Sequence, residues 1–209
     1  MPTSKIPLAR KVVGLLFVLA ASPALADLKP DLIEQLRQGG FVLLMRHASS
    51  PQKPPGKSMA DSQNMGLERQ LDEQGRETAE AMGHAFKALR IPVATVLSSP
   101  TYRALETVRL ARFGTPRTVA QLGDQGHSMA RLNGPGPAAW LQAAVEQMPV
   151  AGKNTIIITH MPNIAAAFPD KASGLQDGET LVFKPDGNGH VQLVAKVLIE
   201  DWPAAIPRK

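Results

Sequence analysis

The chain contains no cysteine, and aromatic side chains are scarce, with one tyrosine and two tryptophans among 209 residues. Without cysteine it can form neither a disulfide nor a thiolate metal site, and it cannot use a cysteine nucleophile. The fold must therefore be stabilised by a hydrophobic core, for which a hydrophobic content of 44% is sufficient. Because so few rings are available to stack on bases, binding of single-stranded nucleic acid is not expected.

A short apolar run lies close to the N-terminus. Three basic side chains precede "VVGLLFVLAA", and "SPALA" follows it with small residues at Ala24 and Ala26. This is the pattern of a secretory signal peptide, and the run is shorter than the roughly 20 apolar residues of a membrane span. We therefore predict a signal peptide over residues 1–26, cleaved near Ala26, and a single periplasmic or secreted domain over residues 27–209. An uncleaved anchor is the alternative.

The same N-terminal segment accounts for most of the positive charge. It holds three basic side chains and no acidic ones. The whole chain has a net charge of +5, and residues 27–209 without this segment have a net charge of +2. A nearly neutral domain offers no broad basic surface, which again argues against a nucleic-acid partner. No other segment is apolar over a length that could span a membrane. The oligomeric state is not encoded in any pattern of this sequence.

Strands and helices alternate along the domain. Apolar runs predict strands at 41–46, 94–99 and 154–160, and "TLVFKPDGNGHVQLVAKVLI" predicts two more strands around a turn. Helical spacing predicts helices over 31–40, 71–90, 99–114 and 134–148. Asp72 is the expected N-cap of the second helix, and Ser99 before Pro100 marks the expected start of the third. The pattern predicts an α/β fold, a three-layer sandwich with a mostly parallel central sheet and helices on both faces.

Basic side chains follow three of the predicted strands. Arg46 and His47 end the first strand, His160 ends the third, and Arg103 lies early in the helix after the second. In open α/β sheets ligands bind outside the carboxyl ends of the strands, so these four side chains should converge. Two arginines and two histidines form an anion site, and a phosphoryl group fits it best because each of its oxygens can accept a hydrogen bond.

The stretches "MRHAS", "SSPTYRALET" and "ITHMPN" resemble the histidine phosphatase (phosphoglycerate mutase-like) superfamily. The segment "RQLDEQGR" is also similar to the one that opens the family's first long helix. The resemblance runs from about residue 40 to the C-terminus. It implies a phosphoglycerate mutase-like fold and a metal-independent phosphatase, a phosphoric monoester hydrolase of exported bacterial type. It implies no cofactor, and a small phosphorylated substrate as the partner.

The resemblance also implies roles for the convergent residues. His47 would be the nucleophile that is transiently phosphorylated, Arg46 and Arg103 would clamp the phosphoryl oxygens, and His160 would bind the same group and stabilise the transition state. A neutral imidazole is a good nucleophile, and nearby guanidinium groups favour that neutral form. Their charges would also take the place of the metal ions used at other phosphotransfer sites.

The proton donor to the leaving group has two candidates, Glu179 in "DGETLVF" and Asp124 in "QLGDQGH". Met161 follows His160 where phytase-like relatives have an aspartate, which makes that branch unlike this chain. The loop from residue 49 to 70 is a possible lid over the pocket. Three functions thus stay open: a phosphomonoesterase, a phosphohistidine-protein phosphatase or mutase with the same first step, and a non-catalytic protein that binds a phosphorylated ligand. The histidine spacing indicates no metal site.

Overall fold

The computed structural model describes residues 28–51, 68–124 and 136–207. Within these ranges the strands form one sheet, in the order β3-β2-β4-β1-β5-β6. The strands are β1 (Val42–Arg46), β2 (Val93–Ser98), β3 (Arg117–Thr118), β4 (Asn154–Thr159), β5 (Thr180–Pro185) and β6 (Val191–Val197). Strands β1 to β4 are mutually parallel, whereas β5 is antiparallel to β1 and β6 to β5. The predicted parallel sheet with a late hairpin is confirmed.

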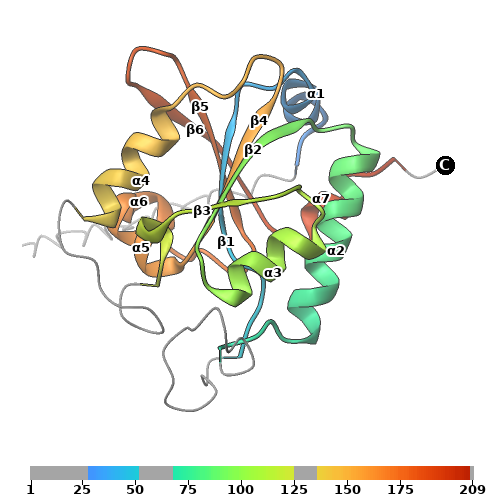
Figure 1. Cartoon of the computed structure of the whole chain (residues 1–209). Helices are drawn as coiled ribbons and strands as arrows, with labels where there is room; N and C mark the ends of the chain where they lie inside the picture. Colours follow the sequence, from blue (N-terminus) through green and yellow to red (C-terminus); the bar gives the residue numbers. More distant parts are fainter. Residues whose placement is uncertain (1–27, 52–67, 125–135, 208–209) are drawn as a thin grey trace, which may run out of the picture.

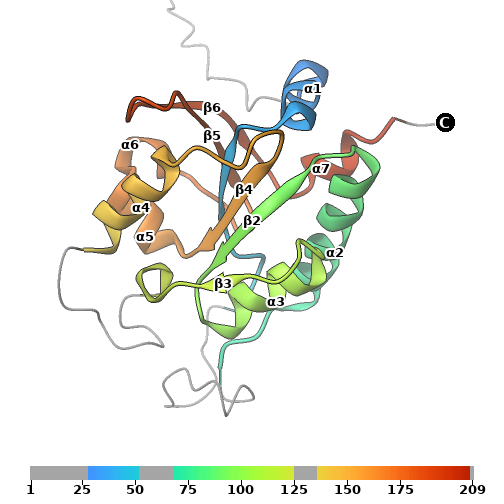
Figure 2. The same cartoon turned by 45° about the horizontal axis from the view of Figure 1, so that its top comes forward.

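Helices cover both faces of the sheet (Figures 1 and 2). On one face lie α1 (Pro30–Gln38), α2 (Glu73–Ala88), α3 (Tyr102–Leu110) and α7 (Asp201–Ala204). On the other lie the 3-10 helix η2 (Ala120–Leu122), α4 (Pro137–Glu146), α5 (Met161–Ala167) and α6 (Pro169–Ala172). This is the three-layer sandwich that the sequence predicts. No helix in the described ranges has the length and apolarity needed to cross a membrane.

Strand β1 separates two apolar clusters. Leu43 and Met45 belong to the cluster beneath α1, α2 and α3, whereas Val42 and Leu44 belong to the cluster beneath α4 and α5. All four side chains are buried. A strand covered on both faces needs an almost continuous apolar sequence, which is why the run "FVLLM" shows no alternation.

The helix α2 begins as predicted. The Asp72 side chain accepts a hydrogen bond from the Gly75 amide at 2.7 Å, which satisfies one of the free amides of the first turn. Further along, Gly83 allows the end of α3 to approach closely, because a Cβ at this position would lie 2.2 Å from the Ala111 carbonyl oxygen. The register between α2 and α3 is fixed by this contact, and α3 carries Arg103.

The predicted start of the third helix is wrong by two residues. The helix begins at Tyr102 with Thr101 in the N-cap position, and the Thr101 side chain makes no cap hydrogen bond. Instead, the Glu68 carboxylate accepts from the Tyr102 amide at 2.6 Å. The Ser99 hydroxyl accepts from the Thr101 amide at 3.2 Å, donates to Thr101 Oγ1 at 3.1 Å and contacts His160, but it lies ahead of the first helical residue. The first amide of the helix itself is capped by Glu68, from a distant part of the chain.

The short elements β3, η2, α5, α6 and α7 were not predicted. Each has seven residues or fewer, which is too short for a periodic pattern to be recognised. Helix α5 matters for the site because it begins directly after His160, which occupies its N-cap position.

Candidate active site

Three neighbouring strands end together at the carboxyl edge of the sheet. Arg46 of β1 is paired with Thr159 of β4, and the His47 amide donates to the Thr159 carbonyl at 3.0 Å. On the other side of β4, the Ser99 amide donates to the Ile158 carbonyl at 2.9 Å. The residues that follow these strand ends are therefore neighbours in space, as the sequence predicts.

The two histidines face each other across this edge. The ring centroids of His47 and His160 lie 5.1 Å apart, with the planes inclined by 64°. Both residues are only 2% exposed. Two imidazoles that are buried so close together cannot both carry a charge without a large cost, so at least one neutral ring is required.

The guanidinium of Arg103 joins the two rings. Its Nε donates to His47 Nε2 at 3.2 Å, and its Nη2 contacts His160 Nδ1 at 3.1 Å. The same Nη2 pairs with Asp124 Oδ2 at 3.0 Å. Arg103 and Asp124 are almost wholly buried, so the ion pair supplies the countercharge that a buried guanidinium needs.

These contacts fix the tautomer of each neutral ring. The Ala48 carbonyl lies 2.8 Å from His47 Nδ1 and can only accept, so Nδ1 carries the proton and Nε2 presents its lone pair. A guanidinium can only donate, so His160 Nδ1 is also an acceptor, and the proton of the neutral ring lies on Nε2. His160 Nε2 is then the donor to Ser99 Oγ at 2.9 Å.

His47 is electrostatically held in its neutral form. Burial, followed by the charge of Arg103, lowers the pKa of His47 from 6.5 to about 3, and the charges of Arg69 and Arg46 act in the same direction. The hydrogen bond to the Ala48 carbonyl opposes this shift in the pKa. At neutral pH the unprotonated Nε2 is therefore ready to act as a nucleophile.

Thr107 ties α3 to the end of β1. Its hydroxyl oxygen accepts from the Ala48 amide at 3.1 Å and donates to the Arg103 carbonyl at 2.8 Å. One side chain thus holds the backbone next to His47 in register with the backbone of Arg103. This contact gives a physical reason for the threonine four residues after the arginine in "SSPTYRALET".

Arg46 lies beside the histidines but is turned towards a loop. Its Nη2 is 2.6 Å from Asp177 Oδ1, and its Nη1 donates to the Leu175 carbonyl at 3.3 Å. Its Nε is buried and has no hydrogen-bond partner within the described residues. Burial raises the pKa of Asp177, although Arg46 and Arg69 both pull it down.

The two candidate proton donors have different surroundings. Asp124 lies in the cluster and is paired with Arg103. Glu179 is buried, and its Oε2 accepts from the Gln176 amide at 2.8 Å. The structure therefore brings Asp124 to the histidines through Arg103. The Glu179 side chain contacts the loop before β5, while the Glu179 carbonyl accepts from the Arg46 amide at 3.2 Å. Its role as proton donor stays a prediction.

Two charged residues of the site were not selected from the sequence, namely Arg69 and Asp177. Arg69 shifts the pKa of His47, and its own pKa is lowered by burial and by Arg103. Neither residue stands at a strand end, so no periodic or positional pattern marked them. The possible lid from residue 49 to 70 falls largely on residues 52–67, which lie outside the described residues.

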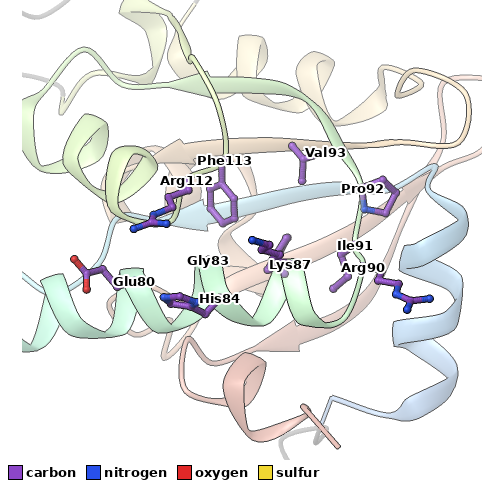
Figure 3. Close-up of a pocket in the computed structure, with 11 residues that line it drawn as sticks. Glu80, Gly83, His84, Lys87, Arg90, Ile91, Pro92, Val93, Arg112 and Phe113 are labelled. Carbon is purple, nitrogen blue, oxygen red and sulfur yellow. The ribbon is translucent and has the colours of Figure 1, made fainter.

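A different cavity lies away from this cluster. It has a volume of about 490 Å³. The second half of α2 and the residues that follow α2 and α3 form it (Figure 3). His84, Lys87 and Arg112 line it, and Phe113 projects over it. None of the residues of the histidine cluster is among those that line it. In the described ranges, no group of three or more histidine, aspartate or glutamate side chains is arranged to hold a metal ion.

The chain is thus an α/β sandwich with a buried histidine and arginine site at the carboxyl edge of its sheet. Residues 42–124, which include His47, Arg103 and Asp124, match the model of the histidine phosphatase superfamily (branch 1). The match covers less than half of the chain and shows a similarity to that superfamily over this segment. His160 and Glu179 lie beyond the matched segment and complete the same sheet edge. No curated protein sequence matches the chain significantly.

Solved structures with the same fold include several phosphatases. The protein histidine phosphatase SixA complexed with tungstate gives a TM-score of 0.55 at 18% identity, over 77% of this chain and 98% of that one. A phosphoserine phosphatase mutant from Entamoeba histolytica in complex with phosphoserine gives 0.51 at 15% identity, over 77% and 98%. Bacillus stearothermophilus YhfR gives 0.52 at 18% identity, over 74% and 95%. The predicted phosphoglycerate mutase-like fold is confirmed.

The low pKa of His47 predicts a specific loss of stability in acid. Below pH 6.5 the unfolded chain binds a proton at this residue, whereas the folded protein does not do so until about pH 3. The free energy of unfolding should therefore fall as the pH drops through this window, by up to about 1.4 kcal/mol per pH unit from this group. Thermal unfolding measured at several pH values should show a shallower dependence for His47→Asn. The exposed His84, changed to Asn, is the matched control, and an unchanged slope in His47→Asn would contradict the assignment.

Proposed function

We propose that this protein is an exported, metal-independent phosphomonoesterase that works through a phosphohistidine on His47. The observation that carries the proposal is the unprotonated Nε2 of His47, which is held neutral by burial and points at the guanidinium of Arg103. A nucleophile beside a fixed cation is what phosphoryl transfer requires, because the protein must mainly position the group and stabilise its charge.

The reaction would proceed in two displacements. In the first, the Nε2 lone pair forms a bond to phosphorus while the ester P–O bond breaks, and the leaving oxygen takes a proton from a donor. In the second, a water oxygen attacks the same phosphorus while the deprotonated donor takes a proton from that water, the P–N bond breaks, and inorganic phosphate leaves with the donor and the neutral imidazole restored. His47 Nδ1 stays bonded to the Ala48 carbonyl throughout, so the ring keeps its orientation.

The remaining polar groups would stabilise the transferred group. Arg103 is within hydrogen-bond distance of both rings, so a phosphoryl group bound between them would accept from its guanidinium. His160 would donate from Nδ1 once that nitrogen takes a proton on binding of the anion, because the proton of the neutral ring lies on Nε2 and is donated to Ser99. Arg46 would join them by exchanging its contact with Asp177 for one with a phosphoryl oxygen.

The first test is hydrolysis of an aryl phosphate by the purified protein in the presence of a metal chelator. We expect activity that resists the chelator and that falls by at least about 1,000-fold in His47→Ala, because the nucleophile is lost. His84→Ala, an exposed histidine on α2, is the matched control and should keep full activity. If the wild type is inactive but still binds inorganic phosphate, the protein is a binding protein instead.

The same assay separates the two candidate proton donors when an alkyl phosphate is added. An alkyl leaving group needs a proton much more than an aryl one does. We expect Glu179→Gln to lower the rate of hydrolysis of the alkyl phosphate much more than that of the aryl phosphate. Asp124→Asn should lower the rates of hydrolysis of the two esters by a similar factor, because Asp124 acts by holding Arg103. If Asp124→Asn slows hydrolysis of the alkyl phosphate selectively and Glu179→Gln does not, the proton donor is Asp124.

The export of the protein is part of the proposal and rests on the N-terminal sequence pattern. The N-terminal residue of the protein recovered from the producing cells tests it. Cleavage after Ala26 predicts that the chain begins at Asp27, as determined by N-terminal sequencing. A chain that retains its first 26 residues would contradict the signal peptide and support an uncleaved anchor.

A further inference from the structure

The segment from Glu68 to Asp72 is attached to the α3 side of the histidine cluster at its first residue. The Glu68 carboxylate accepts from the Tyr102 amide at 2.6 Å, and Tyr102 immediately precedes Arg103. Glu68 is only 4% exposed. A carboxylate at this position also interacts favourably with the N-terminal end of the helix. The start of the segment is therefore fixed relative to Arg103.

The other end of this segment is attached to the β1 side. The Asp72 amide donates to the Ser49 carbonyl at 3.2 Å, and the Ser49 hydroxyl donates to Asp72 Oδ2 at 2.7 Å. Ser49 follows His47 by two residues. The approach is close, because a Cβ on Gly75 would lie 2.1 Å from the Ser49 carbonyl oxygen.

Arg69 lies between these two attachments and faces the same charges as the site. Its pKa is lowered by burial and, among charged groups, most by Arg103, while Asp177 and Asp124 raise it. Conversely, the charge of Arg69 lowers the pKa of His47, and its effect on this pKa is larger than that of Arg46. The attachments of Glu68 and Asp72 and the electrostatic coupling to His47 both indicate that Arg69 belongs to the charged cluster around His47.

The Arg69 guanidinium also has an unused donor. Its Nε is buried and has no hydrogen-bond partner within the described residues, as is also the case for Nε of Arg46. A buried charged donor without an acceptor is costly, and a bound anion is one way to satisfy it. Arg46 and Arg69 both lower the pKa of His47, and two such donors in its surroundings would suit a ligand with several acceptor oxygens.

We propose that Arg69 binds the transferred phosphoryl group directly, as a third guanidinium beside Arg103 and Arg46. This inference rests on the proposed function and extends it to a residue outside the strand ends. Three guanidiniums around one group favour a ligand with two negative charges.

The test compares Arg69→Gln and Arg69→Lys with the wild type in the purified protein. Binding of inorganic phosphate is measured by calorimetry, and kcat/KM is measured with an aryl phosphate. We expect Arg69→Gln to weaken phosphate binding by about 10- to 100-fold, the effect of losing hydrogen bonds to a charged group. Arg69→Lys keeps the charge but loses the planar donors, so its affinity should lie in between. Arg90→Gln, an exposed arginine after α2, is the matched control and should match the wild type.

The thermal midpoint of each variant distinguishes binding from a structural role. If Arg69 binds the ligand, Arg69→Gln keeps the wild-type midpoint without phosphate and loses the stabilisation that phosphate gives. If Arg69→Gln does not fold, Arg69→Lys decides, and wild-type affinity in that variant would overturn the inference. Wild-type affinity and kcat/KM in a folded Arg69→Gln would overturn it as well. A wild-type protein that neither binds phosphate nor hydrolyses the ester would instead overturn the proposed function, and with it the inference.

Discussion

The guanidinium of Arg103, buried between two imidazoles and a carboxylate, sets the conditions that the rest of the site must meet. Because it can only donate, both His47 and His160 must turn a lone pair towards it, and each ring must place its proton on its other nitrogen. Asp124 supplies the countercharge, and removing one partner of such a buried pair typically costs several kcal/mol. One cation therefore determines the tautomers and the position of the acidic residue, and together with burial it keeps His47 neutral.

The charges of the cluster would suit a bound anion. Arg103, Arg69 and Arg46 all lower the pKa of His47, while Asp177 pairs with Arg46 at the edge of the site. Two guanidinium groups keep a buried donor without an acceptor among the described residues. A transition state with charge spread over several oxygens would satisfy these donors at once, and in the proposed reaction the cost of burying them in the free protein would be recovered at that point.

Much of the fold and the centre of the site could be predicted from the sequence, because their signals are local. The runs before His47 and His160 are apolar on both faces, and parallel strands bring their carboxyl ends to one edge. The start of α3 was misplaced because its cap comes from Glu68, which is distant in sequence. Arg69 and Asp177 were missed for a related reason. Their positions depend on contacts between loops and strand ends, which no periodic pattern encodes. The contact of Glu179 with the Gln176 amide likewise follows from the loop before β5.

The central claim is that the phosphoryl group passes through Nε2 of His47, and rapid trapping of the intermediate tests it most directly. The purified protein would be mixed with an aryl phosphate, quenched in alkali within milliseconds, and digested for mass spectrometry of its peptides. The account predicts one phosphoryl group on the peptide that contains His47, stable in alkali and lost in acid, and none in His47→Ala. Turnover by the wild type with no phosphoryl group on His47, or with one on another residue, would contradict it.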